Sequence, residues 1–180
     1  MNKCIKRQPN RLKGRRHFLY KELVMHILLC YSKTTALDLK MWIHMMAGEH
    51  QLEVKEVACE SEEFEKVLSD EAADESLAAI VGMDNAGKAV LQVHDVPKLL
   101  INPVLSFSSE EEEKRVLGSA TRFDRDNTWG IFNCEGDNET YYEKMHSYST
   151  NLTLQFGNHF NTANAELIAE GFFSDIESSK

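Results

Sequence analysis

Residues 77–87 read LAAIVGMDNAG, a short apolar run followed by a glycine-rich turn. The run is too short for a helix standing alone and predicts a buried strand. Gly82 can adopt backbone angles closed to other residues. The small residues Ala86, Gly87 and Ala89 let a following helix pack closely against this strand. A strand, tight turn and helix in this order place the central side chain, Asp84, above the carboxyl edge of a sheet.

Strands and helices are expected to alternate on both sides of this unit. Apolar or alternating runs predict further strands at 26–31, 51–58, 96–101, 128–134 and 152–156. Helical spacing and terminal charges predict helices at 36–47, 61–73, 108–117, 138–146 and 163–176. The alternation favours an α/β fold, with a single doubly wound, mostly parallel sheet of about six strands and helices on both faces.

Local signals refine three of these helices. Gly48 is expected to end the first, and its apolar positions are Leu37, Met41, Ile43, Met45 and Met46. Ser61 resembles a capping residue for the second helix. The last helix is expected to be amphipathic, with its apolar side formed by Leu167, Ile168, Phe172 and Phe173.

Charge divides the chain into two parts. The net charge is −9, yet residues 1–24 hold eight Lys and Arg against one acid, Glu22. We expect 1–24 to be a disordered basic extension, or the result of a start assigned too far upstream, and 25–180 to form one domain. The acidic body argues against nucleic acid as the partner, because phosphate contacts need clustered Lys and Arg.

Composition also bounds the class of protein. The four cysteines are too far apart for a zinc motif or a disulfide framework, so neither a metal nor another cofactor is expected. A secretory signal is not apparent, and no apolar run approaches membrane-spanning length. A cytoplasmic protein that does not associate with membranes is therefore expected, with its oligomeric state left open.

Polar side chains follow three of the predicted strands. Asp84 follows the third, an acidic stretch with Glu135, Asp137 and Glu139 follows the fifth, and His159 follows the sixth. Ligands of such sheets bind at the carboxyl ends of the strands. The order of a nucleophile-like residue, an acid and a histidine is that of α/β hydrolases. Which of the three acids faces His159 stays open.

Four motifs carry a resemblance to a known family. Residues 82–86, GMDNA, resemble the nucleophile elbow G-x-S-x-G with Asp in place of Ser. Residues 96–105, VPKLLINPVL, are similar to a strand leading into an I-N-P motif. Residues 136–139, GDNE, resemble the acid loop and residues 157–160, GNHF, the histidine loop. From residue 79 onward the chain resembles the small esterase-like group of bacterial α/β hydrolases.

The resemblance implies a site and a ligand class. Asp84, Asp137 and His159 would be the catalytic residues, and Gly82, Met83 and Asn85 would form the elbow beside the oxyanion position. A small ester or a related small molecule is the ligand it implies. The chain departs from the pattern at three points: Asp84 replaces the serine, Ala86 replaces the second glycine, and residues 30–33, CYSK, lack the His-Gly pair that contributes oxyanion donors.

Several interpretations fit this mixture. Asp84 could attack as a carboxylate nucleophile, with His159, oriented by Asp137, activating water. Ser32 or Ser106 could serve in its place. Alternatively, hydrolysis has been lost and the scaffold serves in binding or interaction, which the joint absence of a serine and an oxyanion donor favours. A receiver-like phosphoacceptor would need an acidic pair after the first strand to hold Mg²⁺, and residues 31–33 offer none.

Overall fold

A computed structural model describes residues 24–124, 127–134, 152–156 and 162–179 of the chain. The strands are β1 (His26–Tyr31), β2 (Glu53–Ala58), β3 (Leu77–Met83), β4 (Lys98–Ile101), β5 (Thr128–Cys134) and β6 (Leu152–Phe156). The helices are α1 (Leu37–Glu49), α2 (Phe64–Ala72), the short 3-10 turn η1 (Asp84–Ala86), α3 (Gly87–Leu91), α4 (Glu110–Asp124) and α6 (Thr162–Ser178).

The strands form one parallel sheet in the order β2-β1-β3-β4-β5-β6. The predicted α/β class and parallel sheet are therefore confirmed. The chain runs outward from β1 to β2 and then crosses back to β3 on the other side of β1. Adjacent strands at such a reversal send their following helices to opposite faces, and ligands of open α/β sheets bind there, beyond the carboxyl ends. This topological switch lies between β1 and β3.

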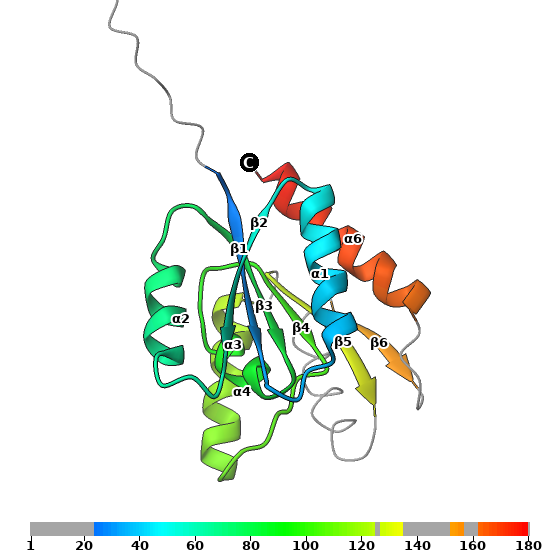
Figure 1. Ribbon diagram of the computed structural model, residues 1–180. Helices are drawn as coiled ribbons and strands as arrows, with labels where there is room; N and C mark the ends of the chain where they lie inside the picture. The colour runs from blue at the N-terminus through cyan, green and yellow to red at the C-terminus, as the bar shows by residue number, and fades with distance from the viewer. Residues whose placement is uncertain (1–23, 125–126, 135–151, 157–161, 180) are drawn as a thin grey trace, which may run out of the picture.

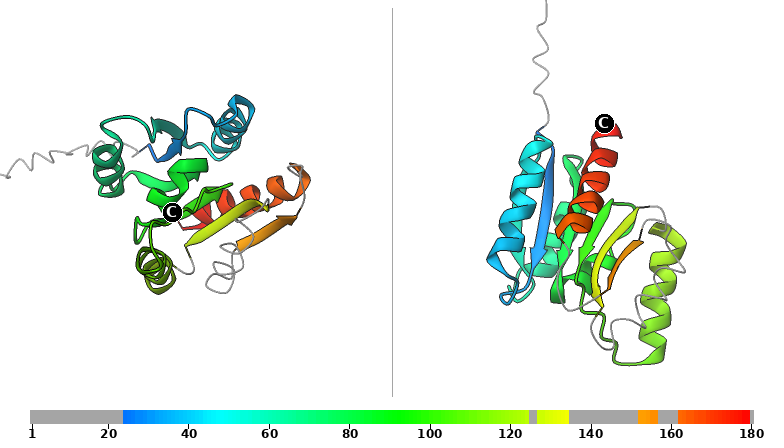
Figure 2. Two further views of the ribbon diagram at one scale, coloured as in Figure 1. Left: turned by 90° about the horizontal axis from the view of Figure 1, so that it is seen from below. Right: turned by 90° about the vertical axis from the view of Figure 1, so that its right-hand side faces the viewer.

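Helices cover both faces of the sheet (Figure 1). Alternate residues of the central strands point to opposite sides, so Ile27 and Leu29 pack beneath α1 and α6 while Leu28 and Cys30 pack beneath α2, α3 and α4. Both views in Figure 2 show the sheet between these two helix layers. Because the central strands are buried on both faces, they are almost continuously apolar, as the sequence indicated.

The described helices differ from the predicted ones at their ends and on one surface. Helix α1 continues through Gly48 to Glu49, so Gly48 does not end it. The expectation for Ser61 is also wrong, because α2 begins at Phe64 after an N-cap at Glu63 that makes no side-chain cap bond. In α1 only Ile43 and Met46 of the five predicted apolar positions are buried; the exposed ones are Leu37, Met41 and Met45.

The last helix, α6, contributes two aromatic side chains to the core. Phe172 and Phe173 are fully buried, and their ring centroids lie 5.3 Å apart in an edge-to-face arrangement. Phe172 also meets the half-buried ring of Trp129 from β5. Leu167, predicted to belong to the apolar side of this helix, is 66% exposed.

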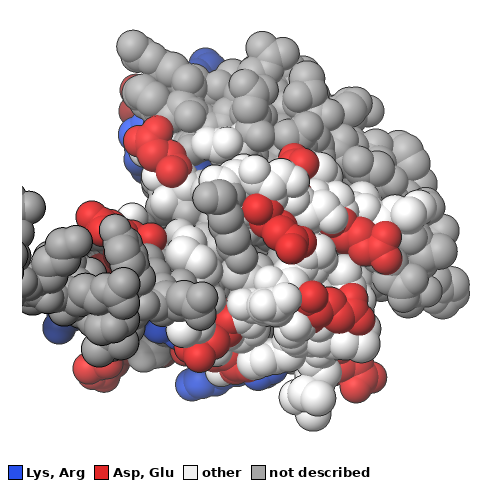
Figure 3. Space-filling view, turned by 90° about the horizontal axis from the view of Figure 1, so that it is seen from above, with Lys and Arg blue, Asp and Glu red and all other residues white. Residues whose placement is uncertain are grey.

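The two edges of the sheet differ in what they carry. Figure 1 shows the carboxyl ends of the strands pointing downward, and the turn after β3 lies at that edge. Figure 3 looks onto the opposite edge, at the amino ends, where acidic side chains prevail over basic ones on the visible described surface. No helix in the described part of the chain is long and apolar enough to cross a membrane.

Candidate functional site

The turn after β3 has the geometry predicted for residues 77–87. Asp84 has a left-handed backbone conformation with a φ of 49°. Residues other than glycine rarely adopt such angles, and strain of this kind clusters at functional sites. The Asp84 carbonyl oxygen accepts hydrogen bonds from the backbone N–H groups of Gly87 and Val104, which fix the turn. The predicted strand, tight turn and helix are therefore confirmed.

Two glycines beside the turn are needed for space. A Cβ on Gly82 would lie 2.8 Å from the Cβ of Val90, and a Cβ on Gly87 would lie 2.9 Å from the Cα of Pro103. The unusual backbone angle expected of Gly82 belongs to Asp84 instead, because Gly82 lies inside β3. Close packing of the helix beside its strand was anticipated correctly, with α3 pressed against β3.

The carboxylate of Asp84 faces the loop that follows β1, which we call the β1 loop (residues 32–35). Asp84 Oδ2 accepts a hydrogen bond from Thr35 Oγ1 at 2.5 Å, a distance typical of a hydroxyl that donates to an ionised acceptor. Thr35 is buried, and its Oγ1 accepts a hydrogen bond from the backbone N–H of Ser32 at 3.0 Å. These contacts join the two strands that flank the topological switch.

Glu60, just after β2, closes the other side of the β1 loop. Its carboxylate accepts hydrogen bonds from the Lys33 backbone N–H at 3.0 and 3.1 Å and from Ser32 Oγ at 2.8 Å. The bond from Ser32, followed by that from Lys33, lowers the pKa of the Glu60 carboxyl. Glu60 therefore stays ionised below the usual range of a glutamate and acts as an anion bound to this loop.

The backbone N–H groups of the β1 loop are all engaged within the protein. Those of Ser32 and Lys33 bond to Thr35 Oγ1 and to Glu60. The N–H of Thr34 donates to Ser32 Oγ at 3.3 Å, and the N–H of Thr35 donates to the Ser32 carbonyl at 2.9 Å. In this conformation the loop offers no spare backbone donor for an oxyanion.

The neighbouring strand also ends in a strained residue. Asn102, directly after β4, has a φ of 45°, and its N–H donates to the carbonyl of Ile131 in β5 at 2.8 Å. Gln51 and Asp95, the other left-handed residues besides glycine in the described ranges, lie in connections at the amino edge. Among the described residues, the left-handed backbone conformations at the carboxyl edge thus lie at the ends of β3 and β4.

Two thiols near this edge are unsuited to nucleophilic chemistry. Burial, aided by the nearby Cys59 thiol, raises the pKa of Cys30 to about 12. Burial and then the negative charge of Glu60 raise the pKa of Cys59. Because the thiolate is the reactive form, both side chains remain unreactive near neutral pH.

The structure describes only part of the predicted site. Met83 is fully buried, Asp84 is partly exposed and Asn85 is exposed. Asp137 and His159 lie outside the described residues, so their convergence with Asp84 stays a prediction.

The remaining sequence-based expectations for this region also fall on undescribed residues. Glu135 and Glu139, the alternative acids, and the helix predicted at 138–146 lie outside the described ranges, as do residues 1–23. The strands that precede the acid and histidine motifs, β5 and β6, pair in parallel and have their carboxyl ends at the same edge as β3.

Sequence reasoning missed Thr35 and Glu60 as members of the site. The polar run at 32–35 was visible as the end of a strand, but its importance depends on β1 lying next to β3, which strand order determines. Glu60 follows β2 within a run of acids that fits an ordinary solvated surface. A polar run after the first strand of an α/β pattern is the signal that could have found Thr35.

The described part of this arrangement can bind hydrogen-bond donors. Asp84 and Glu60 present carboxylates, and the backbone N–H groups of the β1 loop are bonded within the protein. No protein-family model matches the chain, and searches of curated proteins and of solved structures find no match either.

Proposed function

We propose that this chain is a binding protein on an α/β-hydrolase-like scaffold, which holds a small molecule at the carboxyl edge between β1 and β3 and has lost ester hydrolysis. One observation carries the proposal: Thr35 holds the Asp84 carboxylate while every backbone N–H of the β1 loop is bonded inside the protein. The position of a nucleophile and the position of an oxyanion donor are therefore both occupied by structural contacts.

The scaffold assignment has support of two kinds. The left-handed Asp84 occupies the turn between β3 and α3, as the exposed residue of an elbow does, and Gly82 is required for space. The acid and histidine motifs follow β5 and β6 along the chain, which preserves the hydrolase order of nucleophile position, acid and histidine.

The contacts of Asp84 and of the β1 loop support the proposed loss of hydrolysis. A serine nucleophile is replaced by Asp84, whose Oδ2 accepts from Thr35. Removal of one oxyanion donor typically slows acyl transfer by roughly 100- to 1,000-fold. To donate to an oxyanion, Lys33 would have to release Glu60, whose carboxylate it binds through both oxygens.

The charge of the edge indicates the kind of ligand. Among the described residues at the switch, Asp84 and Glu60 contribute carboxylates and Thr34 contributes a hydroxyl. Carboxylates accept hydrogen bonds and repel anions. We therefore expect a small ligand that is neutral or cationic and carries hydroxyl or amino groups.

The second candidate is a hydrolase with Asp84 as its nucleophile. The left-handed conformation of Asp84 favours it, because a strained turn is what exposes a nucleophile in an elbow. A carboxylate needs no base to attack, and the resulting ester would be hydrolysed by water that His159 activates. The two candidates differ in one measurable property, which is turnover.

The test combines turnover and binding on the same proteins. The variants are Asp84→Asn and His159→Ala, with Asp95→Asn as a control because Asp95 is a second left-handed aspartate, at the amino edge. Each is assayed with short-chain nitrophenyl esters and haloacids. Saturation-transfer NMR with a panel of small polyols, amines, amides and esters measures binding.

We expect the wild type to bind fragments, Asp84→Asn to lose this binding and Asp95→Asn to retain it. The wild type should turn over the esters and haloacids no faster than Asp84→Asn does. Turnover by the wild type that both Asp84→Asn and His159→Ala abolish would overturn the proposal and establish the carboxylate nucleophile. Absence of any fragment whose binding depends on Asp84 would also refute it.

A further inference from the structure

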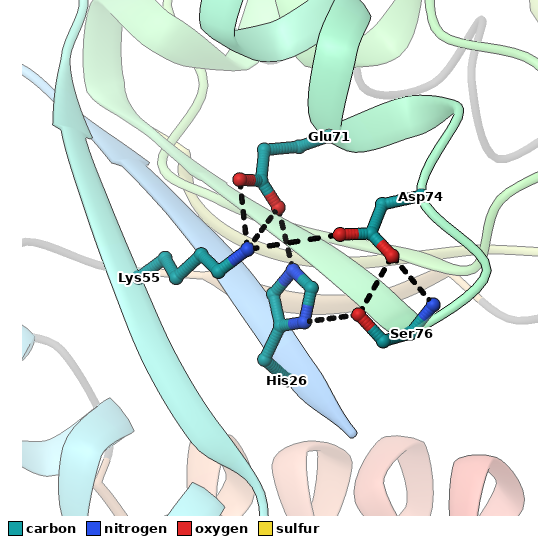
Figure 4. A network of polar contacts seen from close by, with 5 residues as sticks. All are labelled: His26, Lys55, Glu71, Asp74 and Ser76. Carbon is teal, nitrogen blue, oxygen red and sulfur yellow. Dashed lines mark hydrogen bonds and ion pairs between the residues drawn. The ribbon is translucent and has the colours of Figure 1, made fainter. Parts of the chain in front are cut away.

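A buried histidine begins β1 at the amino edge of the sheet, opposite the candidate site. The side chain of His26 is 3% exposed, and its Nε2 lies 2.5 Å from Glu71 Oε2 in the last turn of α2 (Figure 4). Asp74 lies on the connection from α2 to β3. His26, Glu71 and Asp74 each offer one atom that could bind a metal, and these three atoms all lie within 4.8 Å of one another. No other group of three such side chains is found among the described residues.

Hydrogen bonds around His26 fix which of its nitrogens is available. Ser76 has one hydroxyl hydrogen, and it donates to Asp74 Oδ1 at 2.7 Å. Ser76 Oγ can therefore only accept from His26 Nδ1, which lies 3.2 Å away, so Nδ1 carries a hydrogen. Histidine ligands of metals are oriented in this way, by a bond from the second nitrogen to a neighbouring oxygen.

The consequence is that Nε2 faces the Glu71 carboxylate across a short gap. A bare nitrogen lone pair and a carboxylate oxygen repel each other at 2.5 Å, so a proton lies between them. A metal ion bound by both atoms would take the place of this proton and spread the two atoms apart. The surrounding surface at this edge is acidic, which adds to the attraction for a cation (Figure 3).

Lys55 supplies one positive charge in the absence of a metal. Its Nζ lies 2.9 Å from both carboxylate oxygens of Glu71 and 3.8 Å from Asp74 Oδ2. The Lys55 side chain is 45% exposed and projects from β2, which is an edge strand. It can swing into solvent without disturbing the core, so the ammonium can be displaced.

We propose that His26, Glu71 and Asp74 form a Zn²⁺ site, with Lys55 as the cation that a zinc ion displaces. One imidazole and two carboxylates suit Zn²⁺ better than Mg²⁺ or Ca²⁺, which prefer oxygen ligands alone. Zinc ligands at about 2.0–2.2 Å lie roughly 3.4 Å apart in a tetrahedron, so closure needs side-chain movements of about 1 Å. Three protein ligands leave a fourth position open to solvent.

Sequence inspection gave no hint of this site because its residues are not spaced as a motif. His26 and Glu71 are 45 positions apart. Parallel pairing of β1 with β2 and β3 brings together the amino ends of the three strands, and with them the end of α2. Bound zinc would tie the first residue of β1 to the α2–β3 connection.

The test is a titration of the full chain with Zn²⁺, in which calorimetry measures the affinity. A second titration uses Co²⁺ as a zinc substitute and measures its visible absorption. His26→Asn and Asp74→Asn are each expected to weaken binding at least about tenfold, because each removes a ligand. Lys55→Met is expected to tighten binding by removing the competing ammonium. Mg²⁺ should give no response.

His44 provides a matched control, because it also lies 2.5 Å from a glutamate, Glu56, and has a lysine beside the pair. Among the described residues, no third ligand completes a metal-binding group with these two. His44→Asn should bind Zn²⁺ as the wild type does. Equal affinity of the wild type, His26→Asn and Asp74→Asn, or weaker binding by Lys55→Met, would overturn the proposal. If His26→Asn fails to fold, Asp74→Asn and the Co²⁺ spectrum decide, since the Asp74 side chain is 39% exposed.

Discussion

Thr35 Oγ1 donates a hydrogen bond of 2.5 Å to Asp84 Oδ2, which links residues 49 positions apart across the topological switch of the sheet. Thr35 belongs to the β1 loop, whose backbone N–H groups are all hydrogen-bonded within the protein. Asp84 belongs to the turn after β3 and has a left-handed backbone conformation. The position of the Asp84 carboxylate therefore depends on the β1 loop as much as on its own turn.

Thr35→Val should destabilise the protein by about 1–3 kcal/mol, measured as the free energy of unfolding in urea. Valine keeps the shape of threonine but removes the donor to Asp84 and the acceptor for the Ser32 N–H. Thr34→Val is the control, because it removes a hydroxyl from the same loop, with its 3.0 Å contact to Ser32 Oγ, but leaves the bond to Asp84 in place. Thr34 is exposed, so this change should stay within about 0.5 kcal/mol. Equal stabilities of the two variants would mean that the link to Asp84 contributes nothing.

The α/β fold was largely predictable because the strands can be recognised in the sequence. Short apolar runs bounded by turn residues gave β1, β5 and β6 with the bounds that the structure has. Helix faces were harder, because side chains such as Met41 and Met45 are apolar but 60% and 55% exposed. Apolar character alone does not reveal which side of α1 meets the sheet, since that depends on how the helix is rotated against its neighbours.

The candidate site was predictable only in part. The turn at Asp84 is local, so its sequence was sufficient to indicate the geometry. Thr35 and Glu60 join it through the order of β2, β1 and β3, and strand order is a property of the whole sheet. The same reason hid His26, whose partners come from α2 and from the connection after it.

Glu60 is expected to titrate below the ordinary pKa of a glutamate, because the hydrogen bonds from Ser32 and then Lys33 favour its ionised form. Its pKa is lowered in the folded state, so its contribution to stability is complete above the unfolded value of 4.5 and is lost as pH falls through the folded value. NMR should therefore show the Lys33 amide resonance shifting with a midpoint below pH 4.5.

Two variants identify the origin of that titration. Glu60→Gln should remove the shift of the Lys33 amide with pH, while Glu62→Gln, at an exposed neighbouring glutamate, should leave it unchanged. A midpoint at or above 4.5 in the wild type would contradict the binding of the Glu60 carboxylate by the β1 loop.

Gly87→Ala should destabilise the protein by about 1–3 kcal/mol, whereas Gly48→Ala should stabilise it by up to about 1 kcal/mol. A Cβ at Gly87 would lie 2.9 Å from the backbone Cα of Pro103, which cannot move aside as a flexible side chain would. A Cβ at Gly48 would meet nothing within 4 Å, so no steric clash offsets the higher helix propensity of alanine within α1. Urea unfolding of both variants measures the contrast. Gly87→Ala as stable as the wild type would show that the turn at Asp84 does not need close packing against the turn after β4.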